Sequence, residues 1–183
     1  MKYLYNLSEV KPFLTESPRR IILIGFAACY KTTVGKLLAK KLNCAFVDTD
    51  AEIERLEEKS VQQIFDTHGE AYFRRKENEL LRAMDACNTV VSCGGGSVLA
   101  ESFDEFARNG VVIWLTASAN TVKSRLGGVA RPLFDGLTVE QLEERIAERT
   151  SLYSRFACIT FPTDNKTPEQ VAEEIYTWIK KTS

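Results

Sequence analysis

Five short apolar runs are separated by segments with helical periodicity, and this alternation limits the possible folds more than any other feature. The clearest runs are residues 21–24, IILI, and residues 111–115, VVIWL. Similar runs occupy residues 45–48, 89–92 and 158–161. Strands that are apolar throughout are typical of a sheet covered on both faces. Strands alternating with helices therefore predict an α/β fold of three layers, with a parallel sheet between two layers of helices.

Helical patterns fill the segments between these runs. In residues 31–42, apolar side chains recur at helical spacing and share one face. Ser60 and Gln63 have the spacing of a capping box, and Thr167 is a typical N-cap ahead of Pro168. Further helices are predicted at residues 70–86, 100–108, 118–126 and 138–156.

Composition favours an ordinary globular domain. The chain has 183 residues, of which 44% are apolar and 27% are charged, and its formal net charge is −1. This balance suits neither nucleic acid nor an anionic membrane as a partner. No apolar run approaches the ~20 residues of a membrane span, and residues 1–18 lack the apolar core of a signal peptide. Five scattered cysteines without a CxxC pair indicate reduced thiols.

We therefore expect one cytoplasmic domain spanning residues 1–183, which works as a monomer. Residues 1–18 fall outside the alternating pattern and form an N-terminal extension. Residues 127–137, GGVARPLFDGL, are predicted to form a loop that could close over a site.

The first apolar run leads into a loop that could hold phosphate. Gly25 follows the run, and Lys31 and Thr32 open the next helix, so backbone N–H groups and the helix N-terminus would surround an anion. Lys31 could contact the outer phosphates, and Thr32 could bind Mg²⁺. The alternative is a helix that merely begins with polar residues. Tyr30 stands where such loops normally have glycine. If φ is positive there, the strain is about 1–3 kcal/mol, which would weaken nucleotide binding without abolishing it.

Polar residues also follow the other predicted strands. Asp48 and Asp50 come after the second, and Gly94, Gly95 and Gly96 after the third. Because ligands gather at the carboxyl ends of parallel strands, we expect these residues to lie on one rim. Carboxylates, a lysine and arginines on one rim suit phosphoryl transfer, which needs charge neutralisation, a metal ion and a positioned acceptor.

Each carboxylate has a functional and a purely structural interpretation. Asp48 could hold Mg²⁺ or could cap the following helix, and both roles can coexist. Asp50 could orient a substrate hydroxyl and accept its proton, and we expect both aspartates to face solvent or ligand. Arg74 and Glu77 share one helical face, so the glutamate could fix the arginine for two-pronged binding of a substrate carboxylate. Cys29, at a helix N-terminus, is predicted to be an acidified thiol.

Together these features resemble the shikimate kinase family. The segments that carry the resemblance, in chain order, are Gly25 with KTTVG at 31–35, FVDTD at 46–50, GEAYFRRKE at 69–77, GGGSV at 94–98, ARPL at 130–133 and RTSLYSRFA at 149–157. The resemblance implies a small P-loop kinase fold, with a five-stranded parallel sheet in the order 2-3-1-4-5. It also implies transfer of the γ-phosphate of ATP to the 3-hydroxyl of shikimate, with Mg²⁺, on the pathway to chorismate and the aromatic amino acids.

The resemblance assigns roles to particular residues. Lys31, Asp50 and Arg131 are the expected catalytic residues, Thr32 and Asp48 serve Mg²⁺, and Arg125 lies near the adenine. Shikimate is expected to contact the helices at 60–90 and, individually, Asp50, Arg74, Gly95, Gly96 and Arg149. The expected ATP site comprises Gly25, Ala27, Ala28, Cys29, Tyr30, Lys31, Thr32, Thr33, Arg125 and Arg131.

The sequence departs from the family in the phosphate loop, where Ala28 and Tyr30 replace customary glycines. Two alternatives therefore stay open. One is a kinase-like protein that binds the acid but has weakened or lost catalysis. The other is a related small-molecule kinase of the gluconate type, which the paired Arg74 and Arg149 and the three glycines disfavour.

Overall fold

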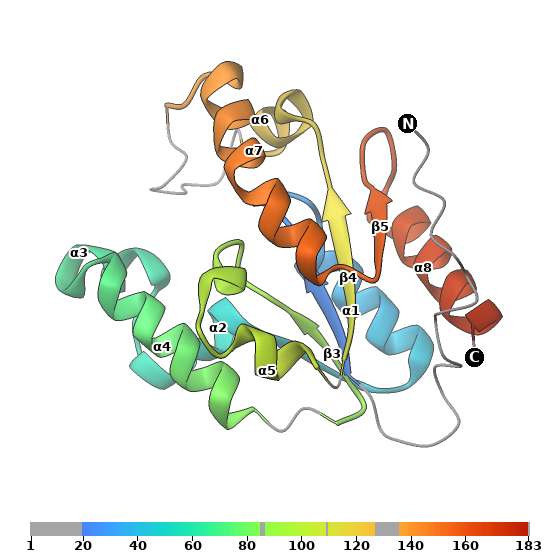
Figure 1. Cartoon of the computed structure of the whole chain (residues 1–183), viewed down its shortest axis with the longest axis horizontal. Coiled ribbons are helices and arrows are strands. Elements are labelled where there is room, and N and C mark those ends of the chain that lie inside the picture. The colour runs from blue at the N-terminus through green and yellow to red at the C-terminus, as the bar shows by residue number, and fades with distance from the viewer. Residues whose placement is uncertain (1–19, 85–86, 109, 127–135, 183) are drawn as a thin grey trace.

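The strands form one parallel sheet in the order β2-β3-β1-β4-β5, in a computed structural model that describes residues 20–84, 87–108, 110–126 and 136–182 (Figure 1). The predicted three-layer α/β class and the strand order are confirmed. The strands are β1 (Arg20–Ile24), β2 (Ala45–Asp48), β3 (Thr89–Ser92), β4 (Gly110–Thr116) and β5 (Ile159–Pro162).

The helices lie close to their predicted positions, with three differences. Helix α4 ends at Ala83, and the segment predicted as one helix at 100–108 contains only the short α5, preceded by the 3₁₀ helix η1. Helix α2 follows Asp48 directly, a position the sequence marked only by its possible N-cap. The helices are α1 (Lys31–Leu42), α2 (Thr49–Glu57), α3 (Val61–His68), α4 (Glu70–Ala83), η1 (Ser97–Leu99), α5 (Phe103–Ala107), α6 (Ala119–Leu126), α7 (Val139–Phe156) and α8 (Pro168–Thr182).

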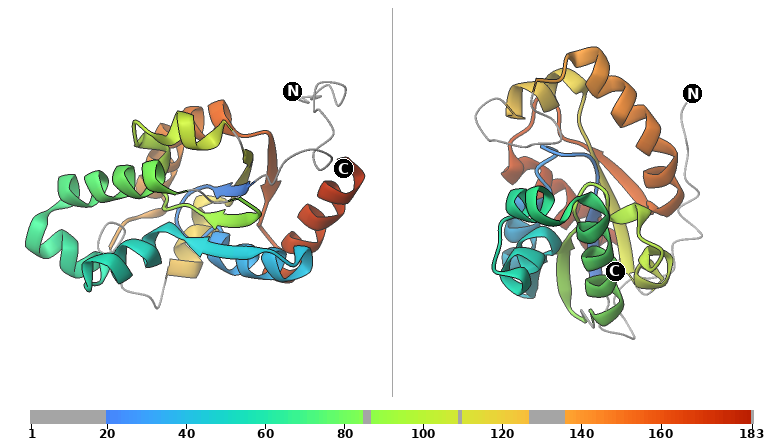
Figure 2. Two further views of the ribbon diagram at one scale, coloured as in Figure 1. Left: turned by 90° about the horizontal axis from the view of Figure 1, so that it is seen from below. Right: turned by 90° about the vertical axis from the view of Figure 1, so that its left-hand side faces the viewer.

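Successive side chains of β1 pack alternately into two separate hydrophobic cores, one on each face of the sheet. Leu23 packs among residues of α1 and α8 on one face of the sheet. Ile22 and Ile24 pack among residues of α4, α5 and α7 on the other. Figure 2 shows α1 on one side of the sheet and α4 and α5 on the opposite side. Because both faces are buried, each strand can be apolar throughout, as the sequence indicated.

Helices α2, α3 and α4 have a small core of their own, made by Ile53, Ile64 and Phe73. In Figure 1 this unit extends from the sheet to form one side of the molecule. Its separate core lets it stand beyond the carboxyl ends of β2 and β3, where it can wall a site.

The register of the strands places the loops that contain the candidate site residues at the same edge of the sheet. Asp48, the last residue of β2, is paired with Ser92, and Ser92 is paired with Leu23 of β1. The loops after β1, β2 and β3 consequently begin side by side at one edge of the sheet.

Three sequence predictions concern residues outside the described ranges. These are the N-terminal extension at 1–18, most of the loop at 127–137, and Arg131 within that loop. Within the described residues, no helix is long and apolar enough to cross a membrane.

Helix α7 begins with a capping box, which yields a stability prediction. The Thr138 hydroxyl accepts a hydrogen bond from the Gln141 backbone N–H, and the Gln141 side chain accepts one from the Thr138 N–H. Thr138→Ala should lower the free energy of unfolding by about 1 kcal/mol, because it removes the cap. Urea denaturation measures this loss, and Thr138→Ser should retain most of the stability. Equal stability of the alanine and serine variants would contradict the assignment of this cap.

Candidate active site

The loop between β1 and α1 has the backbone geometry of an anion cradle. Ala28 and Tyr30 both have positive φ, 60° and 64°, so the strain anticipated for Tyr30 is present and Ala28 shares it. The Lys31 ammonium donates hydrogen bonds to the carbonyl oxygens of Gly25 and Phe26, each at 2.8 Å. Lys31 is thereby held across the mouth of the loop.

Gly25 and Cys29 have structural roles in this loop. Gly25 has a φ of +142°, and a Cβ there would lie 2.2 Å from the Leu115 carbonyl oxygen, so only glycine fits beside β4. The Cys29 side chain is buried, with 1% exposure, and burial raises the pKa of its thiol. The prediction of an acidified Cys29 is therefore wrong, because desolvation outweighs the nearby positive charges of Lys31 and Arg125.

Thr32, at the start of α1, and Asp48, at the end of β2, bring two side-chain oxygens together. The Thr32 hydroxyl donates a hydrogen bond of 2.7 Å to Asp48 Oδ2. Asp48 Oδ1 accepts from the backbone N–H groups of Asp50 and Ala51, so Asp48 also caps α2. One carboxylate and one hydroxyl suit Mg²⁺, which completes its shell with phosphate oxygens and water. No cluster of three or more metal-ligating His, Cys, Asp or Glu side chains occurs in the described residues.

Asp50 carries a partly buried carboxyl group. Its Oδ1 is enclosed and has no hydrogen-bond partner among the described residues, and Asp50 lines the cavity described below, as expected for a residue that faces a ligand. Burial, followed by the negative charges of Glu77 and Asp48, raises the pKa of Asp50 to about 6. A buried oxygen that lacks a partner and lies beside a cavity can accept a hydrogen bond from a ligand in that cavity, so Asp50 is a candidate ligand-binding residue.

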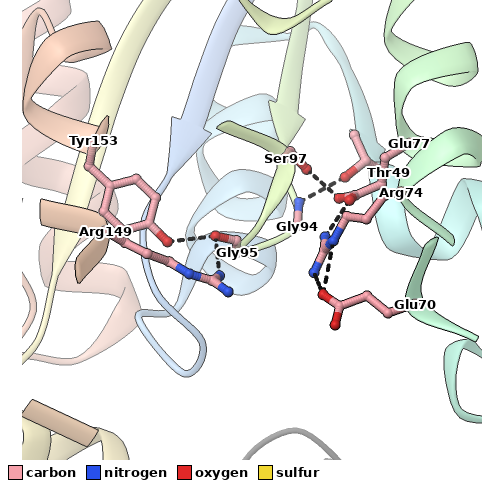
Figure 3. Close-up of polar contacts among 9 residues, drawn as sticks. All are labelled: Thr49, Glu70, Arg74, Glu77, Gly94, Gly95, Ser97, Arg149 and Tyr153. Carbon is pink, nitrogen blue, oxygen red and sulfur yellow. Dashed lines mark hydrogen bonds and ion pairs between the residues drawn. The ribbon is translucent and has the colours of Figure 1, made fainter. Parts of the chain in front are cut away.

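Arg74 is fixed by two carboxylates on its own helix. Its guanidinium pairs with the buried Glu77, and the predicted Arg74–Glu77 pair is thus present. Glu77 also accepts a hydrogen bond of 2.8 Å from the Ser97 hydroxyl, and the exposed Glu70 binds Arg74 at 2.9 Å (Figure 3). A Cβ on Gly96 would lie 2.4 Å from Arg74 Nη1, so glycine is needed where the loop meets this side chain.

Arg149 approaches the glycine run from α7, on the opposite side from Arg74 (Figure 3). Its Nη1 donates to the Gly95 carbonyl oxygen at 2.9 Å, and the Tyr153 hydroxyl donates to the same oxygen at 2.6 Å. Burial raises the pKa of Tyr153 to about 12, so its phenol stays a donor. A Cβ on Gly95 would meet nothing nearer than the Gly25 carbonyl oxygen at 3.6 Å.

Arg125, near the end of α6, also contacts the phosphate loop. Its guanidinium lies 3.6 Å from the centre of the Tyr30 ring and donates a hydrogen bond of 3.0 Å to the Ala28 carbonyl oxygen. The Tyr30 ring is accordingly turned toward α6.

One cavity of about 650 Å³ joins these groups. It is lined by every described residue of the predicted ATP, metal and acid sites except Gly25. Glu54, Val61 and Phe65 also line it. None of them was named individually from the sequence, although Val61 and Phe65 lie within the helices at 60–90 that were expected to contact shikimate. A second hollow of about 670 Å³ beside α8 contains none of the predicted residues.

Comparison with known proteins identifies the family. A family model described as shikimate kinase matches residues 27–180. The chain belongs to the shikimate kinase family. It is 41% identical to the shikimate kinase of Sulfurihydrogenibium sp. (strain YO3AOP1) over 89% of this chain and 99% of that protein. It is also 41% identical to the shikimate kinase of Persephonella marina over 86% of this chain and 96% of that protein.

A solved shikimate kinase structure has the same fold. The enzyme from Acinetobacter baumannii, in complex with shikimate, superposes with a TM-score of 0.84 at 30% identity, covering 90% of this chain and 94% of that chain. Shikimate kinases are ATP-dependent phosphotransferases, and this family membership agrees with a cavity that combines a phosphate loop with carboxylates and arginines.

The raised pKa of Asp50 predicts a pH-dependent loss of stability. The folded protein holds this proton up to about pH 6, whereas the unfolded chain releases it near 3.8. Between these values the native state binds more protons, so stability falls as pH rises. Asp50→Asn removes the charge and should be more stable than the wild type above pH 6, by up to about 3 kcal/mol.

Urea denaturation between about pH 4 and about pH 8 measures this difference. The gain of Asp50→Asn over the wild type should be small at the acid end and should grow as the pH rises through the interval. A gain that is independent of pH would contradict the assignment of the buried charge to Asp50.

Proposed function

We propose that this protein transfers the γ-phosphate of ATP to the 3-hydroxyl of shikimate, a step of chorismate and aromatic amino acid biosynthesis. The observation that carries the proposal is the single cavity that contains both the Lys31 loop and the Arg74, Arg149 and Asp50 groups. ATP is the co-substrate at one end, and a hydroxylated carboxylic acid is the acceptor at the other.

At the nucleotide end, backbone N–H groups of residues 27–31 surround the phosphates, and Lys31 binds the outer ones in place of the Gly25 and Phe26 carbonyls. Thr32 and Asp48 would hold Mg²⁺. The ion, when bound, neutralises charge on the phosphates. On the resemblance alone, we include Arg131 as a contact of the transferred phosphoryl group and the loop at 127–137 as a cover that excludes water.

At the acid end, Arg74 and Arg149 bind the carboxylate of the acceptor. Arg74 is held in place by the buried Glu77, so its guanidinium is positioned before the substrate arrives. Asp50 binds a ring hydroxyl and accepts its proton as the phosphoryl group is transferred. With a pKa of about 6, Asp50 is ionised at neutral pH. This pKa is also closer to the working pH than that of an exposed aspartate, which makes Asp50 the better general base.

Two alternatives have specific consequences. Positive φ at Ala28 and Tyr30 favours a kinase-like binding protein with weakened catalysis, which would bind shikimate and turn over slowly or not at all. A gluconate-type kinase would phosphorylate gluconate in preference to shikimate. The two arginines that flank Gly95 and Gly96 favour a cyclic acid that can lie against a glycine surface.

We also propose a monomeric, cytoplasmic enzyme. The described groups proposed to bind the two substrates line one cavity, and ATP is available in the cytoplasm. No disulfide joins the cysteines within the described residues, and two of them, Cys87 and Cys158, are exposed, which suits a reducing compartment.

A coupled assay of ADP release tests the proposal. The wild-type protein with MgATP should release ADP when shikimate is added, and quinate or gluconate at the same concentration should give at least about tenfold lower kcat/KM, since each mismatched polar group costs roughly 1–3 kcal/mol. Binding of shikimate without ADP release would favour the binding protein, and a preference for gluconate would favour the gluconate-type kinase.

Gly95→Ala tests where the acid binds. There is room for the added methyl group in the protein itself, so the free energy of unfolding should change by less than about 1 kcal/mol. The methyl group would lie 3.8 Å from Arg149 Nη1, in space proposed for the acid, so KM for shikimate should rise at least tenfold. Gly96→Ala, which meets Arg74 directly, should instead lose stability as well. An unchanged KM for shikimate in Gly95→Ala would place the acid elsewhere.

A further inference from the structure

Tyr30 and Arg125 form a stacked pair at the nucleotide end of the cavity. The Arg125 guanidinium carbon lies 3.6 Å from the centre of the Tyr30 ring, within the range of a strong cation–π contact. Both residues line the cavity. They lie 95 positions apart in the sequence, so the pair links the phosphate loop to the end of α6.

Hydrogen bonds fix the edge of the same guanidinium. Arg125 Nη1 donates to the Ala28 carbonyl oxygen at 3.0 Å and to the Thr163 hydroxyl at 2.9 Å, and Nη2 donates to the Thr163 carbonyl oxygen at 2.7 Å. Thr163 is itself buried and bonded to β4 through the Thr116 carbonyl oxygen. The plane of the guanidinium is therefore set by its edge contacts and by the ring beneath one of its faces.

Backbone conformation alone does not explain a tyrosine at position 30. With φ at 64°, glycine would be less strained there. The phenol hydroxyl makes no hydrogen bond within the described part of the chain, so it offers no compensation. What glycine could not provide is the aromatic face against Arg125.

We propose that Tyr30 is a positioning residue for nucleotide binding: its ring supports one face of Arg125 and presents the opposite face of the guanidinium to the purine of ATP. This inference rests on the proposed function. Arg125 contacts the base, and Tyr30 acts through Arg125. The contact between the Tyr30 ring and Arg125 thus compensates for the nucleotide affinity that the loop loses because a tyrosine replaces its customary glycine.

Leucine and phenylalanine at position 30 isolate the aromatic face. Both keep a bulky side chain at positive φ, but only phenylalanine keeps a ring under Arg125. Calorimetric titration with MgADP should give a Kd for Tyr30→Phe within about twofold of the wild type. Tyr30→Leu should bind about 3- to 30-fold more weakly, the range expected for loss of a partly desolvated cation–π contact. Equal Kd values for the two variants would overturn the proposal.

Pyrophosphate is the matched ligand because it has phosphates and no base. Its affinity should be the same in Tyr30→Phe and Tyr30→Leu, because both variants keep the hydrogen bond from Arg125 to the Ala28 carbonyl oxygen and only the contact with a base depends on the ring. An equal loss of pyrophosphate and MgADP affinity in Tyr30→Leu would show that the ring merely shapes the loop, and would overturn the proposal.

Tyr30→Gly should change stability and nucleotide affinity in opposite directions. Relief of strain should make this variant more stable toward urea, yet MgADP should bind more weakly than to the wild type. Tighter binding of MgADP to Tyr30→Gly would show that strain dominates and would contradict the proposal.

Arg125→Gln tests whether Tyr30 acts through Arg125. In that background Tyr30→Leu should have no further effect on the Kd of MgADP, because the pair acts as a unit. Additive losses would contradict the proposal. If the wild type binds MgADP and phosphorylates shikimate while Tyr30→Leu matches Tyr30→Phe, only this inference fails. If the wild type binds no nucleotide, the proposed function itself fails.

Discussion

The parallel pairing of β1, β2 and β3 is the constraint on which the rest of the site depends. Because Asp48, Ser92 and Leu23 are paired in register, the phosphate loop, the Asp48–Asp50 turn and the glycine run all start at one edge of the sheet. Helices α4 and α7 then bring arginines to the glycine run from opposite sides (Figure 3). A shift of one strand by two residues would separate these loops by about 6–7 Å and dismantle the cavity.

Several features of the site lower the stability of the fold, which is common where function sets the geometry. Ala28 and Tyr30 adopt positive φ without being glycine, and Asp50 has a buried oxygen without a partner among the described residues. The surrounding structure holds each of them in place. Lys31 and Arg125 bind carbonyls of the strained loop, and the buried Glu77 ties α4 to the glycine run through Ser97.

Local sequence patterns were enough to predict much of the fold and some contacts of the site. The range of α1 was predicted correctly because its apolar face is regular, and the Ser60 capping box was visible as two residues three apart. The Arg74–Glu77 pair followed from helical spacing. What the sequence could not reveal were long-range contacts and their desolvation. The burial that raises the pKa values of Asp50 and Cys29, and the stacking of Arg125 on Tyr30, depend on segments that meet only in the folded chain.

The central claim is that one cavity takes both a triphosphate and a hydroxylated carboxylic acid. Calorimetric titration of the wild-type protein with a non-hydrolysable MgATP analogue, and then of the resulting complex with shikimate, tests it most directly. The account predicts saturable binding of both ligands at a stoichiometry of about one each, with neither displacing the other. Uptake of shikimate with no uptake of the nucleotide, or competition between the two, would contradict it.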